Sequence, residues 1–431
     1  MLGPTGGEGL GGSEPRSRLT RGLPALRHRN FRLFVIGQGI SLIGFWMQTV
    51  AQGWLVINRL HGTPLDLGMV AFAGYLPILC LAPVAGVIAD RVPRRRVLVV
   101  TQSILMLLAL VLTILVARDA ATVPLVVCLA AGVGIVSALD VPTRQSFLIE
   151  MAGAQDLPNA IALNSSIFNG ARVVGPAIAG SLVAAVGEAP CFFLNGVSYL
   201  AVLIALLRMR LPKATRTATT VRPVHGDFLS GLRYVWRTPV LRNLLLLLGV
   251  VCGVGVRYDM LMPLFAKTVF GAGPETYGLL LTAGGIGSIV AALQLATRRY
   301  TRLQHRRNLL LGLGTFALAV LGLAASRRLE LALCCQVLAG YGMVRYLATT
   351  NTLLQLVVDE RYRGRVMGLH TVMFLGTQPV GSLLLAGLAE RFGAPGAAMV
   401  SGLVSFAAAG WLGFRLRRLA RREREATASA A

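Results

Sequence analysis

Long apolar blocks recur along the chain, each about the length that a helix needs to cross a bilayer. A hydrocarbon core of about 30 Å requires about 20 apolar residues in helical form. No block alternates polar and apolar residues with a period of two, so the strands of a membrane barrel are excluded and helices remain. Twelve blocks are found, near 31–58, 66–90, 96–117, 122–148, 158–186, 189–208, 240–270, 275–297, 307–326, 330–357, 365–389 and 394–415.

One long polar interval, 210–239, separates the sixth block from the seventh. The pattern therefore predicts an all-α integral membrane fold with twelve transmembrane helices in two six-helix halves, 31–209 and 240–416. Part of the interval lacks apolar periodicity and suits a flexible linker. Its second part predicts an amphipathic helix on the membrane surface, with a merely solvated linker as the alternative. The apolar face of that helix would be formed by Phe228, Leu229, Leu232, Val235 and Trp236.

The two halves resemble each other in sequence. When the chain is shifted by 206 residues, 163–187 falls on 369–393 with seven identities in 25 positions. The matching glycines are informative because chance pairs of leucine are common in membrane helices. They are Gly170 with Gly376, Gly175 with Gly381, and Gly187 with Gly393. This repeat places the fifth span over the eleventh, as in transporters whose halves rock around a central site.

Composition and charge agree with a membrane protein. Hydrophobic residues make up 55% of the chain and charged residues only 14%, with a mean hydropathy of +0.67. Soluble proteins carry roughly 25% charged residues, so an ordinary soluble enzyme and a disordered chain are both excluded. The net charge of +24 would by itself suggest nucleic-acid binding.

The distribution of the basic residues argues against nucleic acid. If both termini are cytoplasmic, 33 of the 42 Lys and Arg lie in cytoplasmic segments, which is the positive-inside pattern. We therefore expect a multi-pass protein of the plasma membrane, in bacteria the inner membrane, whose basic loops contact anionic lipids. Residues 1–30 are expected to be a disordered cytoplasmic tail, and 417–431 a cytoplasmic basic tail.

No sequence feature indicates an enzyme, a metal site or a cofactor. The six cysteines lie in apolar runs without metal-ligand spacing, and we interpret them as packing residues. The chain has no nucleophile elbow, no Walker A loop and no zinc-protease motif. An ATP-driven pump within this chain is thereby excluded.

The loop between the second and third spans carries a specific motif. It reads Gly86-Val-Ile-Ala-Asp90-Arg91-Val-Pro93-Arg94-Arg95-Arg96. Asp90 at a helix end can accept charge-assisted hydrogen bonds from arginines or from a neighbouring helix N-terminus. The run predicts a latch that stabilises one conformer and breaks in the other. The alternative is a plain basic turn.

The fifth span carries a second motif, in which Gly170, Gly175, Pro176 and Gly180 share a run that begins at Asn169. Small residues allow close helix approach, and a proline bends a helix. The alternative is ordinary small-residue packing.

Together these motifs resemble those of the major facilitator superfamily, with Pro93 in place of a glycine in the first. The wider pattern over about 30–416 resembles the branch with the enterobactin exporter and macrolide-efflux proteins. The resemblance implies export from the cytoplasm driven by proton entry. It places Gly86, Asp90, Arg91, Arg94 and Arg95 in the inner latch, with Asp140 and Arg144 nearby at the cytoplasmic end of span 4.

Charged residues inside the spans are candidates for function because they are costly in lipid. Arg172 lies midway along span 5, and its counterpart under the 206-residue shift is Gln378. We expect Arg172 to bind an anionic substrate or pair with a carboxylate. The alternative is an arginine that pins helices together. Asn169 is a further polar candidate on this pathway.

Span 7 contains a single acid, Asp259, preceded by Arg257. Two residues apart on a helix they point to different faces, so their pairing with each other is not expected. We predict that Asp259 carries the proton, although an outer-end salt bridge is the alternative. Arg345 in span 10 is a buried cation expected to face the cavity with Tyr341 and Tyr346. His370 could titrate, but a structural role is more common for such a residue.

The sequence thus favours a proton-coupled secondary transporter that exports a small hydrophobic or siderophore-like molecule by alternating access. The expected partners are this small molecule, protons and membrane lipids, with no nucleic acid and with a monomeric chain. Two alternatives are a proton-coupled importer of a small nutrient and a non-transporting membrane sensor or scaffold.

Overall fold

The computed structural model describes residues 24–210, 224–298 and 300–429. Within these ranges the side chains of 82–91, 154, 224–229, 302–303 and 416–429 are outside the description. The described residues are almost entirely helical. The first half comprises η1 (Pro24–Arg27), α2 (Arg29–Trp54), η2 (Leu55–Arg59), α3 (Pro64–Arg91), α4 (Arg94–Ala117), α5 (Val123–Val186) and α6 (Ala189–Arg208).

The second half begins with a short helix and then repeats the six spans. Its elements are α7 (Val224–Arg237), α8 (Pro239–Val250), η3 (Val251–Gly255), η4 (Val256–Leu261), α9 (Met262–Leu264), η5 (Phe265–Val269), α10 (Pro274–Thr297), α11 (Arg302–Ala325), α12 (Leu329–Val357), η6 (Glu360–Tyr362), α13 (Arg363–Thr371), η7 (Val372–Gly376) and α14 (Gln378–Ser429).

Eleven helical segments of the described chain are long and apolar enough to cross a membrane, and the last of these, Glu360–Arg415, contains two spans. The chain breaks its helical conformation at Gly393, where φ is +69°, and turns from span 11 into span 12. Gly187 has φ of +84° at the equivalent turn between spans 5 and 6. Glycine adopts this conformation without a steric penalty. The prediction of twelve transmembrane helices is confirmed.

The turn between spans 4 and 5 is shorter than the pattern predicts. The apolar blocks leave 149–157 as a connection, but α5 is helical throughout except at Gly153, where φ is +73°. Span 4 therefore extends from Val123 to Gly153, and span 5 from Gln155 to Val186. Because Gly153 alone reverses the chain, the polar residues of 149–157 belong to the ends of the two helices and not to a loop.

Span 7 is an irregular helix. It passes from α8 through the π-helical segment η3 to the 3₁₀ segment η4 and then through α9 to the π-helical η5. Pro263 has no amide hydrogen to donate to the carbonyl of Asp259. The amide of Met262 bonds that carbonyl instead, which tightens the turn before the proline. The irregularity falls on the charged residues of this span.

The sequence repeat appears as a repeated contact between helices. A side-chain carbon at Gly175 would lie 2.5 Å from Cβ of Trp46, so span 5 touches span 1 there. A carbon at Gly381 would overlap the carbonyl oxygen of Gly253, so span 11 touches span 7 in the same way. Position 253 lies 206 residues after Met47, which is also close to Gly175. Glycine at both sites allows the helix backbones to meet.

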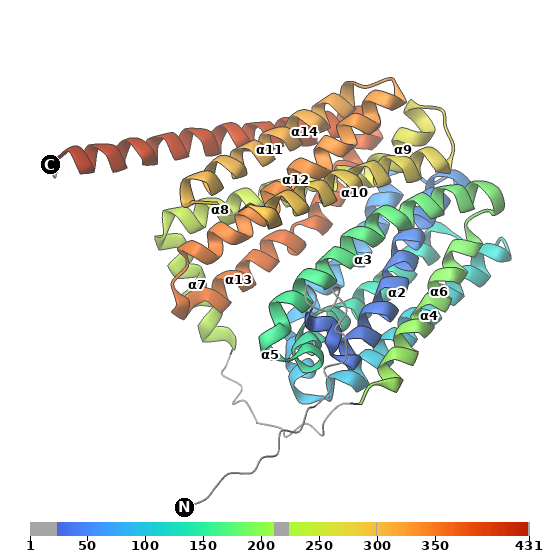
Figure 1. Cartoon of the computed structure of the whole chain (residues 1–431). Coiled ribbons are helices and arrows are strands. Elements are labelled where there is room, and N and C mark those ends of the chain that lie inside the picture. The colour runs from blue at the N-terminus through green and yellow to red at the C-terminus, as the bar shows by residue number, and fades with distance from the viewer. Residues whose placement is uncertain (1–23, 211–223, 299, 430–431) are drawn as a thin grey trace, which may run out of the picture.

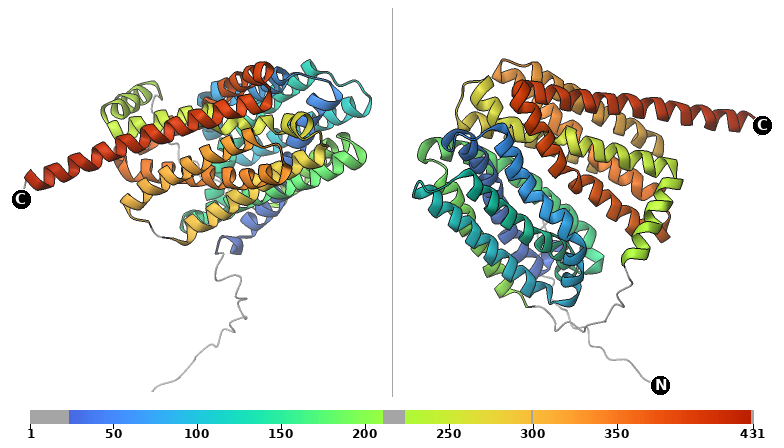
Figure 2. Two further views of the ribbon diagram at one scale, coloured as in Figure 1. Left: turned by 90° about the horizontal axis from the view of Figure 1, so that it is seen from above. Right: turned by 180° about the vertical axis from the view of Figure 1, so that it is seen from behind.

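The two halves lie side by side along two pairs of helices. The second part of α5 packs against α10, and α3 packs against α14. Gly180 and Gly278 meet in the first pair, and Gly68 and Ala386 meet in the second. The helices of the halves converge at the end that carries these contacts and diverge towards the end near α7 (Figures 1 and 2).

Hydrogen bonds between the halves belong to the same end. Lys267 donates from Nζ to the carbonyl oxygen of Ile57 at 2.8 Å, and the amide of Leu65 donates to Glu390 at 3.2 Å. The first bond joins the ends of spans 1 and 7, and the second joins the start of span 2 to the end of span 11. A third, from Thr282 Oγ1 to the carbonyl of Val173 at 3.3 Å, lies deeper in the bundle.

The helix α7 lies at the start of the second half and packs on α13. The rings of Tyr234 and Tyr362 are stacked with centroids 4.2 Å apart. Trp236 is exposed, and the guanidinium of Arg242 lies over its ring. The exposed aromatic and the adjacent cation suit the boundary between lipid and water.

We predict that Gly381→Ala destabilises the protein, because the added methyl group has no room against the backbone of span 7. Overpacking of this kind typically costs about 1–3 kcal/mol. The free energy of unfolding can be measured by SDS titration in mixed micelles. Gly387→Ala in the same helix is the matched control, since nothing lies within 4 Å of its new carbon. Equal effects of the two substitutions would contradict the proposed close contact.

Candidate functional site

A charged cluster joins the two halves at span 7. Arg257 is 8% exposed, and its Nη1 atom lies 3.6 Å from Oδ1 of Asp259. The same guanidinium lies over the ring of Tyr75 in span 2, with its carbon 5.2 Å from the ring centroid. Arg257 therefore contacts an acid of its own half and an aromatic ring of the other half.

The pairing of Arg257 with Asp259 corrects the expectation from sequence. In a regular helix the two side chains would point to different faces. Here they lie on the 3₁₀ segment η4, between the π-helical segment η3 and Pro263. The changed helical turn brings the two charged groups within ion-pair distance.

A second cluster lies between spans 1 and 5. The guanidinium carbon of Arg172 lies 5.6 Å from the ring centroid of Trp46. Trp46 also packs edge to face against Phe45 and Phe168, with centroids 5.7 and 5.8 Å apart. Its Nε1 atom is buried and has no hydrogen-bond partner among the described residues. The contact of Gly175 with Trp46 fixes the two helices at this place.

The two clusters face the same region between the halves. Residue 172 lies against the second half, because a side-chain carbon at Gly285 of span 8 would lie 3.2 Å from its carbonyl oxygen. Tyr258 precedes Asp259 in span 7 and is buried. Its hydroxyl donates to Oε1 of Gln336 in span 10 at 2.7 Å. Arg172 and the pair of Arg257 with Asp259 therefore both lie where the two halves meet.

Asn169 and Gln378, the two amides predicted from the sequence to line the substrate or proton pathway, bond to the backbone of their own helices. Asn169 donates from Nδ2 to the carbonyl oxygen of Ser165 at 2.8 Å. Gln378, the repeat counterpart of Arg172, is buried and donates from Nε2 to the carbonyl oxygen of Phe374 at 3.0 Å. The halves thus differ at this position, with a charge in one and an amide bonded to its own backbone in the other.

Arg345 belongs to a separate network inside the second half. It donates to Oδ1 of Asn308 at 2.5 Å and to the hydroxyl of Tyr341 at 2.8 Å. Tyr341 in turn bonds Gln294, so the network joins α10, α11 and α12. Tyr346 is fully buried elsewhere and does not share these contacts. The expectation that Arg345 faces a cavity with both tyrosines is replaced by a contact between helices.

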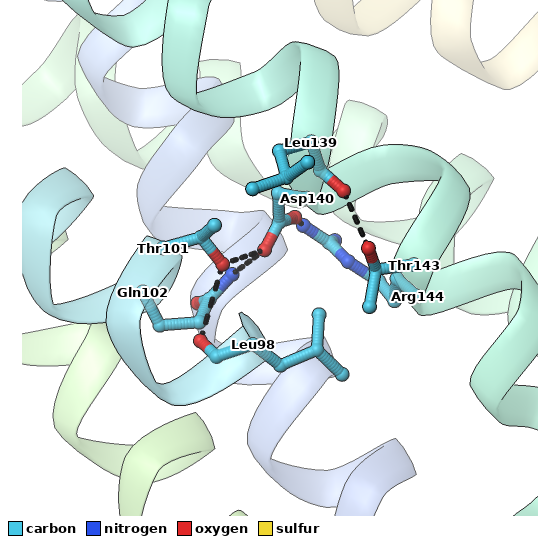
Figure 3. Close-up of polar contacts among 7 residues, drawn as sticks. All are labelled: Leu98, Thr101, Gln102, Leu139, Asp140, Thr143 and Arg144. Carbon is cyan, nitrogen blue, oxygen red and sulfur yellow. Dashed lines mark hydrogen bonds and ion pairs between the residues drawn. The ribbon is translucent and has the colours of Figure 1, made fainter. Parts of the chain in front are cut away.

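A third polar cluster fixes spans 3 and 4 of the first half (Figure 3). Asp140 is 1% exposed and forms an ion pair with Arg144 one turn later. Its other oxygen accepts hydrogen bonds from Thr101 Oγ1 at 2.7 Å and from Gln102 Nε2 at 2.8 Å. Asp140 and Arg144 were expected together, whereas the two polar residues of span 3 were missed.

The predicted latch is described only in part. The side chains of Asp90 and Arg91 and the surroundings of Gly86 lie outside the description, so the role of these three residues stays a prediction. Arg94 forms an ion pair with Glu150 at the end of span 4. Arg95 donates to the carbonyl oxygen of Leu207 in span 6 at 2.8 Å. These two arginines tie the start of span 3 to neighbouring helices.

The small residues of span 5 divide between two contacts. Gly180 lies close to Gly278 of span 8, and a carbon at Gly278 would lie 2.5 Å from the carbonyl oxygen of Pro176. Gly175 faces span 1, as described above. A carbon at Gly170 would meet nothing within 4 Å. Most of the run therefore lies at helix contacts, and Gly170 does not.

Some residues of the site give no signal in the sequence. Tyr75 and Trp46 lie in apolar blocks where aromatic residues are common, and only the fold brings them onto the arginines. Thr101 and Gln102 form a polar pair within the apolar span 3, which is a signal that could have been used. Among the described residues no group of three His, Cys, Asp or Glu side chains could hold a metal ion.

Twelve spans in two related halves, with buried charges where the halves meet, define a secondary transporter of the major facilitator type. More narrowly, the chain belongs to the transmembrane secretion effector family, whose model matches residues 20–431. The family resemblance expected from the motifs is confirmed, as is the expectation of a membrane transporter rather than an enzyme.

Curated relatives from bacteria cover most of the chain. The staphyloferrin A transporter of Staphylococcus aureus is 28% identical, covering 84% of this chain and 90% of its own length. The multidrug efflux pump Tap of Mycolicibacterium fortuitum is 29% identical, over 83% and 87%. Macrolide efflux protein A of Streptococcus pyogenes is 22% identical, over 83% and 88%.

Solved structures share the fold at low sequence identity. A bacterial homologue of the human lysosomal transporter Spinster, in an inward-facing and occupied conformation, has a TM-score of 0.68 and 16% identity, covering 90% of this chain and 97% of its own. The nucleoside transporter NupG has a TM-score of 0.70 and 11% identity, covering 89% and 98%.

We predict that Asp140→Asn lowers the free energy of unfolding by about 3 kcal/mol, because the charge of Arg144 then has no partner. SDS titration in mixed micelles measures this value. Replacing both residues, with Asp140→Asn and Arg144→Gln, should recover part of the loss. The control is Glu150→Gln, which breaks a partly exposed pair with Arg94 and should cost less than about 1 kcal/mol. Equal losses in the two single variants would contradict this assignment.

Proposed function

We propose that the protein exports a small hydrophobic or siderophore-like organic molecule from the cytoplasm in exchange for protons. Two of the relatives named above are efflux proteins, and a third is a siderophore transporter. Their names support a cargo that is organic and small. The chain would act as a monomer in the bacterial inner membrane, with anionic lipid headgroups against its basic loops.

The orientation that we propose places both termini in the cytoplasm. The basic residues support it, because 33 of 42 then lie on the cytoplasmic side. In this orientation the loops after spans 1 and 7 are external, and the contacts of Lys267 and Glu390 between the halves close the outer side. The structure then corresponds to a transporter closed to the outside, and cargo would enter from the cytoplasm.

One observation carries the coupling mechanism: the Arg257 guanidinium contacts Asp259 of its own half and Tyr75 of the other half. Protonation of Asp259 would remove the negative partner of Arg257. The strength of the contact between the Arg257 guanidinium and the Tyr75 ring would then change. Separation of the halves at the outer side would also break the contact with Tyr75. Proton binding and the opening of the outer side would therefore act on the same side chain.

The exchange cycle follows from this arrangement. With Asp259 charged, cargo enters from the cytoplasm while the outer side is closed, and the loaded protein then opens to the outside. When the outer side opens, Asp259 becomes accessible from outside and takes up a proton as cargo leaves. The proton passes to the cytoplasm when the inner side opens again.

We predict that Asp259→Asn uncouples cargo movement from protons. The variant cannot lose a proton at this position, so proton flux driven by cargo should fall about tenfold or more, equivalent to about 1.4 kcal/mol. The measurement uses the full chain in liposomes with a pH-sensitive dye inside, to which panels of small organic acids, bases and neutral compounds are added. Asp119→Asn, which changes an exposed acid in the loop after span 3, is the control.

Two results would contradict the proposal. One is cargo accumulation in everted vesicles that persists after an ionophore collapses the proton gradient. The other is proton flux in Asp259→Asn equal to that of the unmodified protein, which would move the coupling site elsewhere.

A further inference from the structure

We infer that the cluster of Arg172, Trp46, Phe45 and Phe168 is a binding site for the anionic group and the ring of an aromatic organic acid. This inference rests on the proposed function, because it names the chemical class of the cargo. It is carried by four features of the cluster: an unpaired cation, an unused hydrogen-bond donor, open aromatic faces and a position between the halves.

Arg172 differs from Arg144, Arg257 and Arg345 in the partner that the protein supplies for its charge. Arg144 pairs with Asp140, and Arg257 pairs with Asp259. Arg345 donates to the oxygens of an amide and a phenol. The contact found for Arg172 in the described structure is the ring of Trp46, with no carboxylate in ion-pair distance. An unpaired cation within a span is costly in lipid. An anion from the cargo would offset that cost.

Trp46 supplies a hydrogen-bond donor that the protein leaves unused. Its Nε1 atom is buried without a partner among the described residues. A buried donor of this kind normally finds an acceptor, and leaving it unsatisfied is costly. A carboxylate or phenolate oxygen bound by Arg172 would be an acceptor suited to the adjacent indole N–H.

Phe45 and Phe168 provide the surface for a ring. Each packs edge to face against Trp46, and each is 41% exposed. Edge-to-face pairs leave part of each ring free for a further aromatic contact. Rings with centroids 5.7 and 5.8 Å from Trp46 therefore form two sides of an aromatic site next to the cation.

The position of the cluster argues that it faces the cargo pathway and not the lipid. Span 5 contacts span 1 through Gly175 and span 8 through Gly180. A side-chain carbon at Gly285 of span 8 would lie 3.2 Å from the carbonyl oxygen of Arg172. Arg172 therefore lies at the boundary between the halves, where alternating access would expose it.

The chemistry selects one class of cargo. A guanidinium binds a carboxylate through paired, charge-assisted hydrogen bonds, and aromatic rings add stacking. The three charges near the boundary, Arg172, Arg257 and Asp259, leave an excess of one positive charge. Amines and quaternary ammonium compounds are disfavoured by the same excess, and neutral compounds gain only the ring contacts.

Binding of matched naphthalene probes to the purified full chain tests the inference. The probes are 2-naphthoate, 2-naphthalenemethanol and 2-naphthylmethylammonium, measured by isothermal titration calorimetry in one detergent. We expect 2-naphthoate to bind about tenfold more tightly than the alcohol, as one charge-assisted contact would give. The ammonium probe should bind more weakly than both.

Three variants assign the effect to the cluster. Arg172→Gln should remove the preference for 2-naphthoate over the alcohol, whereas Arg172→Lys should keep part of it. Trp46→Phe retains a ring but lacks the N–H, so it should weaken binding of 2-naphthoate more than binding of the alcohol. Arg118→Gln, at an exposed position after span 3, is the charge-matched control and should bind all three probes like the unmodified protein.

The inference fails if the unmodified protein binds the three probes equally, or if Arg172→Gln retains the preference for the anion. If Arg172→Gln does not fold, Arg172→Lys and Trp46→Phe decide the outcome. These results are separate from the test of the proposed function. Binding without a preference for the anion would overturn this inference and leave the proposal of proton-coupled export intact. A failure of the liposome assay would overturn that proposal and leave the binding measurements unchanged.

Discussion

A charge inside a bilayer is costly unless the protein supplies a partner, and this constraint organises most polar contacts of the structure. Asp140 meets an arginine, a hydroxyl and an amide from two helices. Arg257 meets an acid on its own helix and a ring on the opposite half. Each of these sets of contacts ties particular helices together, because the partners come from different spans. The buried charges thereby divide into those that hold one half together and those that lie between the halves.

The second organising contact is the meeting of helix backbones at glycines. Gly175 and Gly381 bring spans 5 and 11 onto spans 1 and 7 within each half. Gly180 and Gly278 bring span 5 onto span 8 between the halves. In lipid no hydrophobic force drives helices together, so close approach and van der Waals contact must supply the attraction. The charged clusters described above depend on the helix positions that these contacts fix.

The sequence predicts most of the fold because the physics of the bilayer acts on long segments. Apolar length gives the twelve spans, and the repeat of glycines relates the halves. Single turns are less predictable, as the helical connection at Gly153 demonstrates. The pairing of Arg257 with Asp259 could not be predicted from spacing, because Pro263 and the π-helical turns change the local helix. The aromatic partners of the arginines come from other spans, so periodicity within one helix gives no information on them.

The packing of Gly180 against Gly278 has a consequence for the mechanics of the molecule. Where two helices meet through backbone atoms, no side chains interlock across the contact. Such surfaces can roll over each other without changes of rotamer, whereas interdigitated leucines would have to separate and repack. The energy barrier to relative movement would then come mainly from the hydrogen bonds that cross between the halves, such as those of Thr282 with Val173 and of Lys267 with Ile57. The glycine contact permits rotation of one half against the other, and these bonds oppose it.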